Sequence, residues 1–272
     1  MRPAGLASFR AAAGETAGAM GRWAVAHLHR LTDQAGFAGR LLSLSCRPIR
    51  GLGFRLVLDE VFKLARISLP LTLLVGFIMG GAWAFIWLGP LAYLGGSLNN
   101  ITSALITVNS LLLAPLLVSV IVIFGYGAST IWELAVMKAT GQFETLTRLG
   151  VPPEHFLALP RIWATVIALP PLLAVFTLAS FVGAYLMVWQ YTSHSVPAFI
   201  ISLNDNARVL HFVAILLKGF GLSLSLSFFT IYGGFEMETG GLGHGSDILS
   251  QALAEAFVFS TLTNLLVSAF FR

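Results

Sequence analysis

Two long stretches of this chain contain no charged side chain. No Asp, Glu, Lys or Arg occurs between Arg66 and Glu133, or from Ile162 to Asn204. Each stretch exceeds the ~20 apolar residues that a helix needs to cross the hydrocarbon core of a bilayer. Because lipid offers no partners to backbone N–H and C=O groups, such stretches predict membrane-spanning helices. The whole chain is only 10% charged, whereas soluble domains carry about 25%.

The apolar segments divide into five predicted spans. The first uncharged stretch is too long for one helix and is interrupted by Gly-Gly-Ser-Leu-Asn-Asn at residues 95–100. Pro115 lies inside the second predicted span and predicts a kink there, because proline has no N–H to donate. Residues 192–209 are expected to form a polar loop or a short helix. The predicted spans cover residues 67–94, 103–132, 162–190, 210–232 and 250–271.

The predicted fold class is therefore an all-α polytopic membrane protein, with residues 53–272 as its transmembrane domain. In the first span, Gly76, Gly80 and Gly81 would let neighbouring helices approach closely. The single cysteine excludes a disulfide within the chain.

Residues 1–52 form a basic N-terminal segment in which arginines alternate with aromatic and aliphatic residues. This mixture is typical of amphipathic helices that lie on the membrane surface. A loosely ordered basic tail is the alternative.

The distribution of basic residues predicts the orientation. Lys and Arg concentrate in cytoplasmic loops. The N-terminal segment is basic, and the 133–161 loop carries Lys138, Arg148 and Arg161. We therefore expect a cytoplasmic N-terminus, a cytoplasmic 133–161 loop and, after five spans, a periplasmic C-terminus in a cell inner membrane.

No catalytic motif is apparent. No G-x-x-x-x-G-K-[ST] sequence surrounds Lys63, Lys138 or Lys218, so the chain lacks a P-loop for ATP. The six histidines are scattered and form no metal-ligand pattern. We expect no enzyme activity, no cofactor bound by this chain and no nucleic-acid partner. An acidic residue in mid-span, which an ion-coupled carrier normally needs, is also missing.

Ionisable residues in or beside spans are candidate functional residues, because burying a charge in hydrocarbon is costly. Lys218 lies about two turns into the fourth span, where its ammonium would contact a lipid phosphate or snorkel to the interface. Glu133 ends the second span, where it would pair with a basic residue, line a cavity or mark the membrane boundary. Aromatic residues of the first span, among them Phe77, Trp83, Phe85 and Trp87, would form an apolar wall or an ordinary packing surface.

The charged segment between the second and third spans is the most informative one. It combines a short amphipathic pattern with Gly-Val-Pro-Pro at residues 150–153 and Pro-Arg at 160–161. A helix of this kind would dock a cytoplasmic partner, or it would merely rest on the membrane.

This segment resembles the MlaE/YrbE permease family, whose pattern A-E-[LI]-G-x-M-x-x-T-E-Q-[IL] continues to G-V-[DN]-P and later P-R. Here the matching residues are Trp132–Met137, Thr140–Leu146, Leu149–Pro153 and Pro160–Arg161. Weaker similarities cover about residues 50–270. Gly125 and Gly141 stand where the family usually has Arg and Glu, and an acidic Glu-Met-Glu occupies residues 236–238.

The resemblance implies a homodimeric permease subunit of a lipid ABC transporter. Its implied partners are a cytoplasmic ATPase that binds ATP and Mg²⁺, an MCE-domain protein and a STAS-domain regulator, and its substrate would be a phospholipid. The residues implied in ATPase coupling are Met137, Gln142, Phe143, Glu144, Leu146, Gly150 and Pro152. The residues proposed to face a lipid cavity are Phe77, Trp83, Phe85, Trp87, Glu133 and Lys218. A non-transporting scaffold that anchors a cytoplasmic partner is the alternative function.

Overall fold

The computed structural model describes residues 32–41, 52–93, 98–192, 195–207, 209–237 and 242–270. Contacts divide the chain into residues 1–48 and residues 49–272. In the first unit, residues 32–41 form one helix, and the rest of the predicted amphipathic segment there lies outside the described residues. The boundary predicted at residue 52 stays a prediction.

The second unit consists of helices, and its described residues contain no strand. Its elements are α2 (Leu52–Tyr93), α3 (Leu98–Ala104), the π-helix η1 (Leu105–Leu113), α4 (Ala114–Val122), the π-helix η2 (Ile123–Gly127), α5 (Ala128–Ala139), α6 (Gln142–Arg148), the π-helix η3 (Glu154–Ala158), α7 (Leu159–Thr192), α8 (Val196–Asn206), α9 (Val209–Glu236) and α10 (Leu242–Phe270).

Five segments are long and apolar enough to span a membrane, which confirms the predicted fold class. They are Phe54–Leu88, Thr102–Ala139, Glu154–Tyr191, His211–Glu236 and Ile248–Phe270. The helices extend beyond the predicted spans where charged residues follow or precede them. In α2, for example, the helix begins at Leu52 rather than near residue 67, because charged residues mark the limit of an uncharged stretch and do not end a helix.

The second span is a succession of α- and π-helical stretches rather than one regular helix. Before Pro115 the chain forms η1, and the Ala114 N–H bonds to the carbonyl of Asn109, five residues back. Membrane helices tolerate proline through local adjustments of this kind. At Pro115, where a kink was predicted, the structure has a π-helical stretch that ends where α4 begins, and this break in the second span lies directly before the proline.

The α2 and α7 helices make the most extensive contact in the described chain, and glycines make it possible. A Cβ atom built on Gly80 would lie 1.9 Å from the carbonyl oxygen of Ser180, and one on Gly183 would lie 2.0 Å from that of Phe77. The two backbones thus touch where no side chain separates them, which confirms the close approach predicted for this glycine-containing span.

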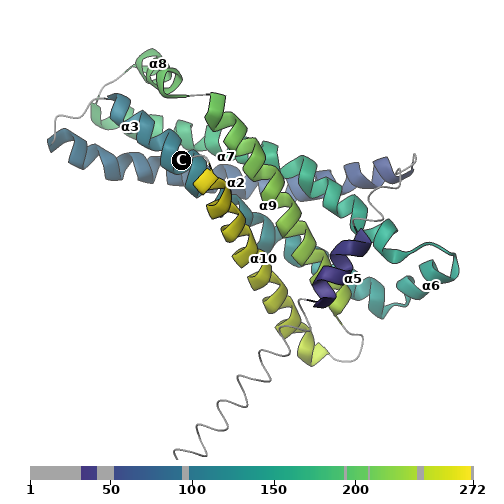
Figure 1. The fold of residues 1–272 in the computed structure, drawn as a ribbon. Helices are drawn as coiled ribbons and strands as arrows, with labels where there is room; N and C mark the ends of the chain where they lie inside the picture. The colour runs from purple at the N-terminus through teal and green to yellow at the C-terminus, as the bar shows by residue number, and fades with distance from the viewer. Residues whose placement is uncertain are drawn as a thin grey trace, which may run out of the picture. The chain divides into compact units, whose positions relative to one another are not determined.

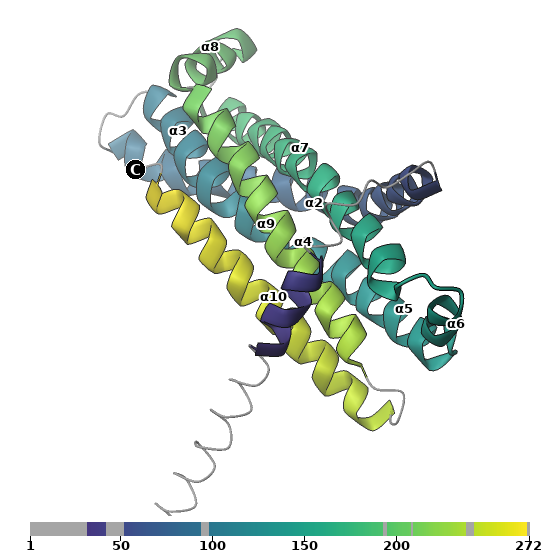
Figure 2. The same ribbon diagram turned by 45° about the vertical axis from the view of Figure 1, so that its right-hand side comes forward.

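The remaining spans pack beside this pair. The α9 and α10 helices run side by side, and α9 also contacts α7 and α5 (Figures 1 and 2). The ends of the unit differ: α5 and α6 lie at one end, whereas α3, α8 and the C-terminal end of α10 lie at the opposite end (Figure 1). Three spans follow α6, and this odd number of crossings places the C-terminal end of α10 opposite α6.

Candidate functional site

The short helix α6 connects the second and third spans, and two glycines define its limits. Gly141 has φ 73° and Gly150 has φ 76°, backbone conformations that favour glycine. After α6, the Val151 N–H bonds to the Leu146 carbonyl at 3.0 Å and the Gly150 N–H bonds to the Thr147 carbonyl at 3.0 Å. This pair of bonds is a Schellman motif. Gly141, which departs from the family pattern, thus supplies the turn between α5 and α6.

The α6 helix is held against the end of α9. The rings of Phe143 and Phe235 lie 5.0 Å apart at an angle of 49°. Beside them, the Lys138 ammonium donates to the Phe235 carbonyl at 2.7 Å. Any displacement of α6 therefore acts on the end of the fourth span as well as on α5.

The predicted coupling residues divide between this contact and the surface. Gln142, Glu144, Gly150 and Pro152 are exposed, whereas Met137, Phe143 and Leu146 are half-buried. Phe143, Glu144 and Pro152 line one hollow of about 680 Å³. Leu149, the last apolar position of the pattern, is 73% exposed. Phe143 is thus engaged within the chain, and Leu149 is the most exposed apolar residue beside α6.

A cluster of charged residues joins the segments on both sides of α6 to the first span. Arg161, only 4% exposed, donates from Nε to Glu60 at 3.1 Å and from Nη2 to Glu133 at 3.3 Å. Lys63 donates to the second Glu133 oxygen, and the Tyr126 hydroxyl donates to Glu60 at 3.0 Å. Glu133 precedes α6 and Arg161 follows it, so both ends of the segment are bonded to α2.

Of the three roles left open for Glu133, the structure shows pairing with basic residues. Its partners are Arg161 on α7, in the segment that follows, and Lys63 on α2. Lys63 and Glu60, which joins the cluster through Arg161, were not identified from the sequence. A signal exists for both, because they are three residues apart, hence on one helix face, and lie shortly before the first uncharged stretch.

The structure places the residues proposed to face a lipid cavity at four separate positions. Phe77 and Phe85 line a hollow of about 890 Å³ between α2 and α7. The rings of Trp83 and Trp87 contact each other at 6.2 Å. Trp83 also packs against a small apolar cluster that includes Leu105 and Phe199.

The two ionisable residues of that set lie elsewhere. Glu133 belongs to the Arg161 cluster, and Lys218 is 1% exposed and bonded within the chain. No single cavity within the described part of one chain brings the six residues together.

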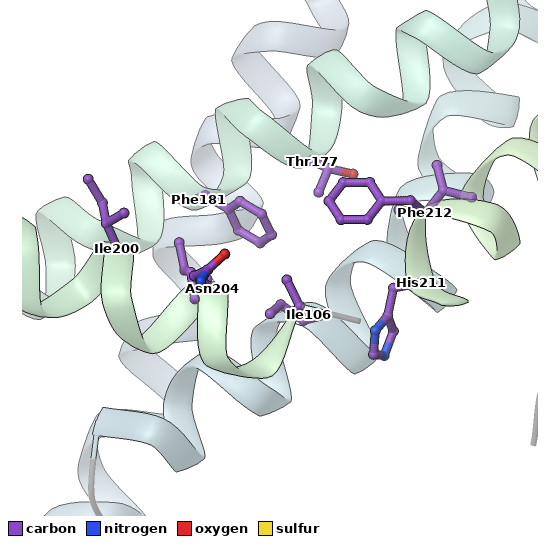
Figure 3. Close-up of a pocket in the computed structure, with 10 residues that line it drawn as sticks. Ile106, Thr177, Phe181, Ile200, Asn204, His211 and Phe212 are labelled. Atoms are coloured by element: carbon purple, nitrogen blue, oxygen red, sulfur yellow. The ribbon is translucent and has the colours of Figure 1, made fainter. Parts of the chain in front are cut away.

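A third hollow lies near the end of the unit opposite α6, and sequence reasoning missed it. It has a volume of about 250 Å³ and is lined by α7, α8, α9 and η1. Figure 3 shows Phe181, Asn204 and Ile106 turned toward one another across it. Its walls are apolar, with Thr177, Asn204 and His211 as polar groups. Because these residues come from four distant segments, no local sequence pattern identifies them.

The fold and these features define a multi-pass helical membrane protein that presents a short, firmly held helix between its second and third spans. The family described as Permease MlaE matches residues 57–272. The chain belongs to this family.

The chain is also similar to curated proteins named as probable ABC transporter permease proteins. It is 24% identical to one from Rickettsia typhi over 217 residues, covering 78% of this chain and 82% of that protein. It is 24% identical to one from Rickettsia prowazekii over 221 residues, covering 80% and 83%. A similarly named protein of Pyropia yezoensis is 26% identical over 152 residues, covering 55% and 57%. The chain is thus an ABC transporter permease of the MlaE family.

We predict that Arg161→Gln destabilises the protein by about 2 kcal/mol, because it removes the charged hydrogen bonds from a buried guanidinium to the partly exposed carboxylates of Glu60 and Glu133. Thermal unfolding of the purified protein in detergent measures the effect. The matched control is Arg148→Gln. Arg148 pairs with Glu144 on the surface of α6, where both side chains are about four-fifths exposed, and such a pair contributes little. Equal unfolding temperatures for the two variants would contradict a structural role for the Arg161 cluster.

Proposed function

We propose that this chain is the permease subunit through which an ABC transporter moves phospholipid between the inner membrane and a periplasmic MCE-domain protein. A separate ATPase, which binds ATP and Mg²⁺, drives the movement from the cytoplasm. The observation that carries the proposal is the attachment of α6, whose two flanking segments bond to α2 through Glu133 and Arg161. The family membership supplies the class of transporter.

The proposed docking surface for the ATPase is the exposed side of α6 and the turn after it. Gln142, Glu144 and Pro152 supply exposed polar and turn positions, and Leu149 supplies an apolar anchor that is 73% exposed. This surface is supported by three half-buried residues, Met137, Phe143 and Leu146, and Gly150 forms the turn after α6. A small apolar contact surrounded by polar groups is typical of protein–protein interfaces.

Movement of the docked ATPase would reach the spans by two routes. One runs from Phe143 to Phe235 at the end of α9. The other runs from Glu133 and Arg161 to Lys63 and Glu60 of α2. Because α2 and α7 are in backbone contact at Gly80 and Gly183, we expect them to move as one body. Rigid-body movement of packed elements is a common form of conformational transition.

The lipid path would lie toward the end of the unit opposite α6. Lipid sites are largely apolar with a few polar groups, and the hollow around Phe181 and Asn204 has this composition (Figure 3). Phe77, Trp83, Phe85, Trp87 and Glu133 remain proposed walls of a larger cavity completed by a second copy of the chain. A contact between Lys218 and a lipid phosphate would require its present bonds to Leu111 and Ser268 to break.

The proposed assembly is a homodimer, in keeping with the symmetry that most oligomers adopt. The MCE-domain protein would stand over the dimer on the periplasmic side, and a STAS-domain regulator would bind on the cytoplasmic side. The α6 end would face the cytoplasm together with the N-terminus, and the C-terminus would face the periplasm.

We predict that Leu149→Asp releases the ATPase during purification of the complex. The charge replaces an exposed apolar anchor, so the interface is weakened while folding of the permease is preserved. Quantitative mass spectrometry of the co-purified subunits measures the loss, for which we expect about tenfold, or ~1.4 kcal/mol. Ile201→Asp is the control, because Ile201 is 61% exposed on α8 at the opposite end. Full retention of the ATPase by Leu149→Asp would place the docking surface elsewhere.

We predict that Ile200→Trp slows phospholipid transfer by the reconstituted complex about tenfold, because a larger ring occupies the hollow that Ile200 lines. The matched control is Ile201→Trp, since its neighbour on α8 is similarly exposed but does not line the hollow. Transfer of a fluorescent phospholipid between liposomes and the purified MCE-domain protein is the measurement. Equal transfer rates for the two variants would exclude this hollow from the lipid path.

A further inference from the structure

The carbonyl of Leu111 lies where the π-helical η1 is followed by α4, four residues before Pro115. In an α-helix this carbonyl accepts from the N–H four residues on, which is position 115. Pro115 has no N–H. Pro115 is buried, and a carbonyl left without a partner in an apolar interior costs several kcal/mol by order of magnitude.

Lys218 supplies the missing donor. Its ammonium donates to the Leu111 carbonyl and to the Ser268 hydroxyl, the latter at 2.7 Å. Lys218 lies on α9, Ser268 lies on α10, and Leu111 belongs to η1. One side chain therefore connects the break in the second span to both the fourth and the fifth spans.

The environment of Lys218 is built for this contact. Its side chain is 1% exposed, so it does not snorkel to an interface. Among the described residues, no acidic side chain forms an ion pair with it. Asn264, one helical turn before Ser268, donates to the next carbonyl, that of Leu112, at 3.4 Å. Two consecutive carbonyls beside the proline are thus bonded by side chains of neighbouring spans.

We propose that Lys218 is a positioning residue that replaces the backbone donor missing at Pro115 and fastens the broken second span to α9 and α10. A charged group is costly to keep inside a membrane, and this bond gives it a structural purpose that needs no ligand. The break separates residues 98–113 from residues 114–139, which lead directly into the α6 segment. The functional consequence rests on the proposed transport function: the bond determines how movement of residues 114–139 is transmitted to residues 98–113.

The sequence allows a rescue experiment. Lys218→Met removes the donor, and Pro115→Ala restores an N–H at the position whose N–H an α-helix bonds to the Leu111 carbonyl. We expect Lys218→Met to lower the unfolding temperature of the detergent-purified chain by roughly 3 °C or more. We expect the double variant Pro115→Ala/Lys218→Met to regain most of that loss. Pro171→Ala/Lys218→Met is the matched control, because Pro171 is an exposed proline inside α7, remote in sequence from Leu111.

Phospholipid transfer by the intact complex, normalised to folded permease, is the second measurement. We expect about a tenfold loss for Lys218→Met, recovery with Pro115→Ala and a smaller loss for Lys218→Gln, which keeps a donor without the charge. If Lys218→Met prevents accumulation of the protein, recovery of accumulation by Pro115→Ala but not by Pro171→Ala supports the proposal equally.

The contrary results are equally specific. Failure of Pro115→Ala to restore either stability or accumulation would overturn the proposal. So would an equal loss of transfer for Lys218→Gln and Lys218→Met without rescue, which would assign the charge to an anionic lipid group. Rescue of stability in a complex that transfers no phospholipid would support this inference while contradicting the proposed function.

Discussion

The rest of the structure depends on the two ion pairs made by the guanidinium of Arg161. It is buried where the third span begins, and it binds carboxylates from the first and second spans. A buried ion pair adds little net stability compared with apolar packing, but losing one partner is costly. The cluster therefore fixes which helices meet at this end of the unit. It also holds the segments before and after α6.

Other contacts restrain the helices farther along the spans. The glycine contact between α2 and α7 leaves no room for the two helices to slide without a clash of backbone atoms. Beside them, the second span combines α- and π-helical stretches, which makes it the least regular of the five. The bond from Lys218 reaches that span at its proline. In this arrangement a rigid pair of helices lies next to a broken one, and the broken one carries the α6 segment.

Much of the fold followed from the sequence for a simple reason. Lipid excludes charge over a defined thickness, so the uncharged stretches located the spans without any tertiary information. The limits of the helices were less predictable, because α2 continues through charged residues outside the hydrocarbon core. The short helix α6 and the close approach at Gly80 also followed from local patterns.

The contacts between distant segments did not follow from the sequence. Glu133 and Arg161 were recognised one by one, but their meeting with Glu60 and Lys63 depends on how α2 packs against α7. Pro115 and Lys218 were both noted as unusual, and nothing in their spacing indicated that one repairs the defect of the other. The hollow at Phe181 and Asn204 is formed by four segments and has no local signature. Pairings of this kind depend on tertiary packing, which the sequence pattern does not encode locally.

We expect α6 and the Arg161 cluster to face the cytoplasm while α8 faces the opposite side. Labelling with a membrane-impermeant maleimide tests it directly, using a Cys46→Ser background with single cysteines at Thr147 on α6 or at Ile201 on α8. In spheroplasts that express this chain alone, the account predicts labelling at position 201 and none at 147 until the membrane is permeabilised. Labelling of position 147 in intact spheroplasts would contradict it.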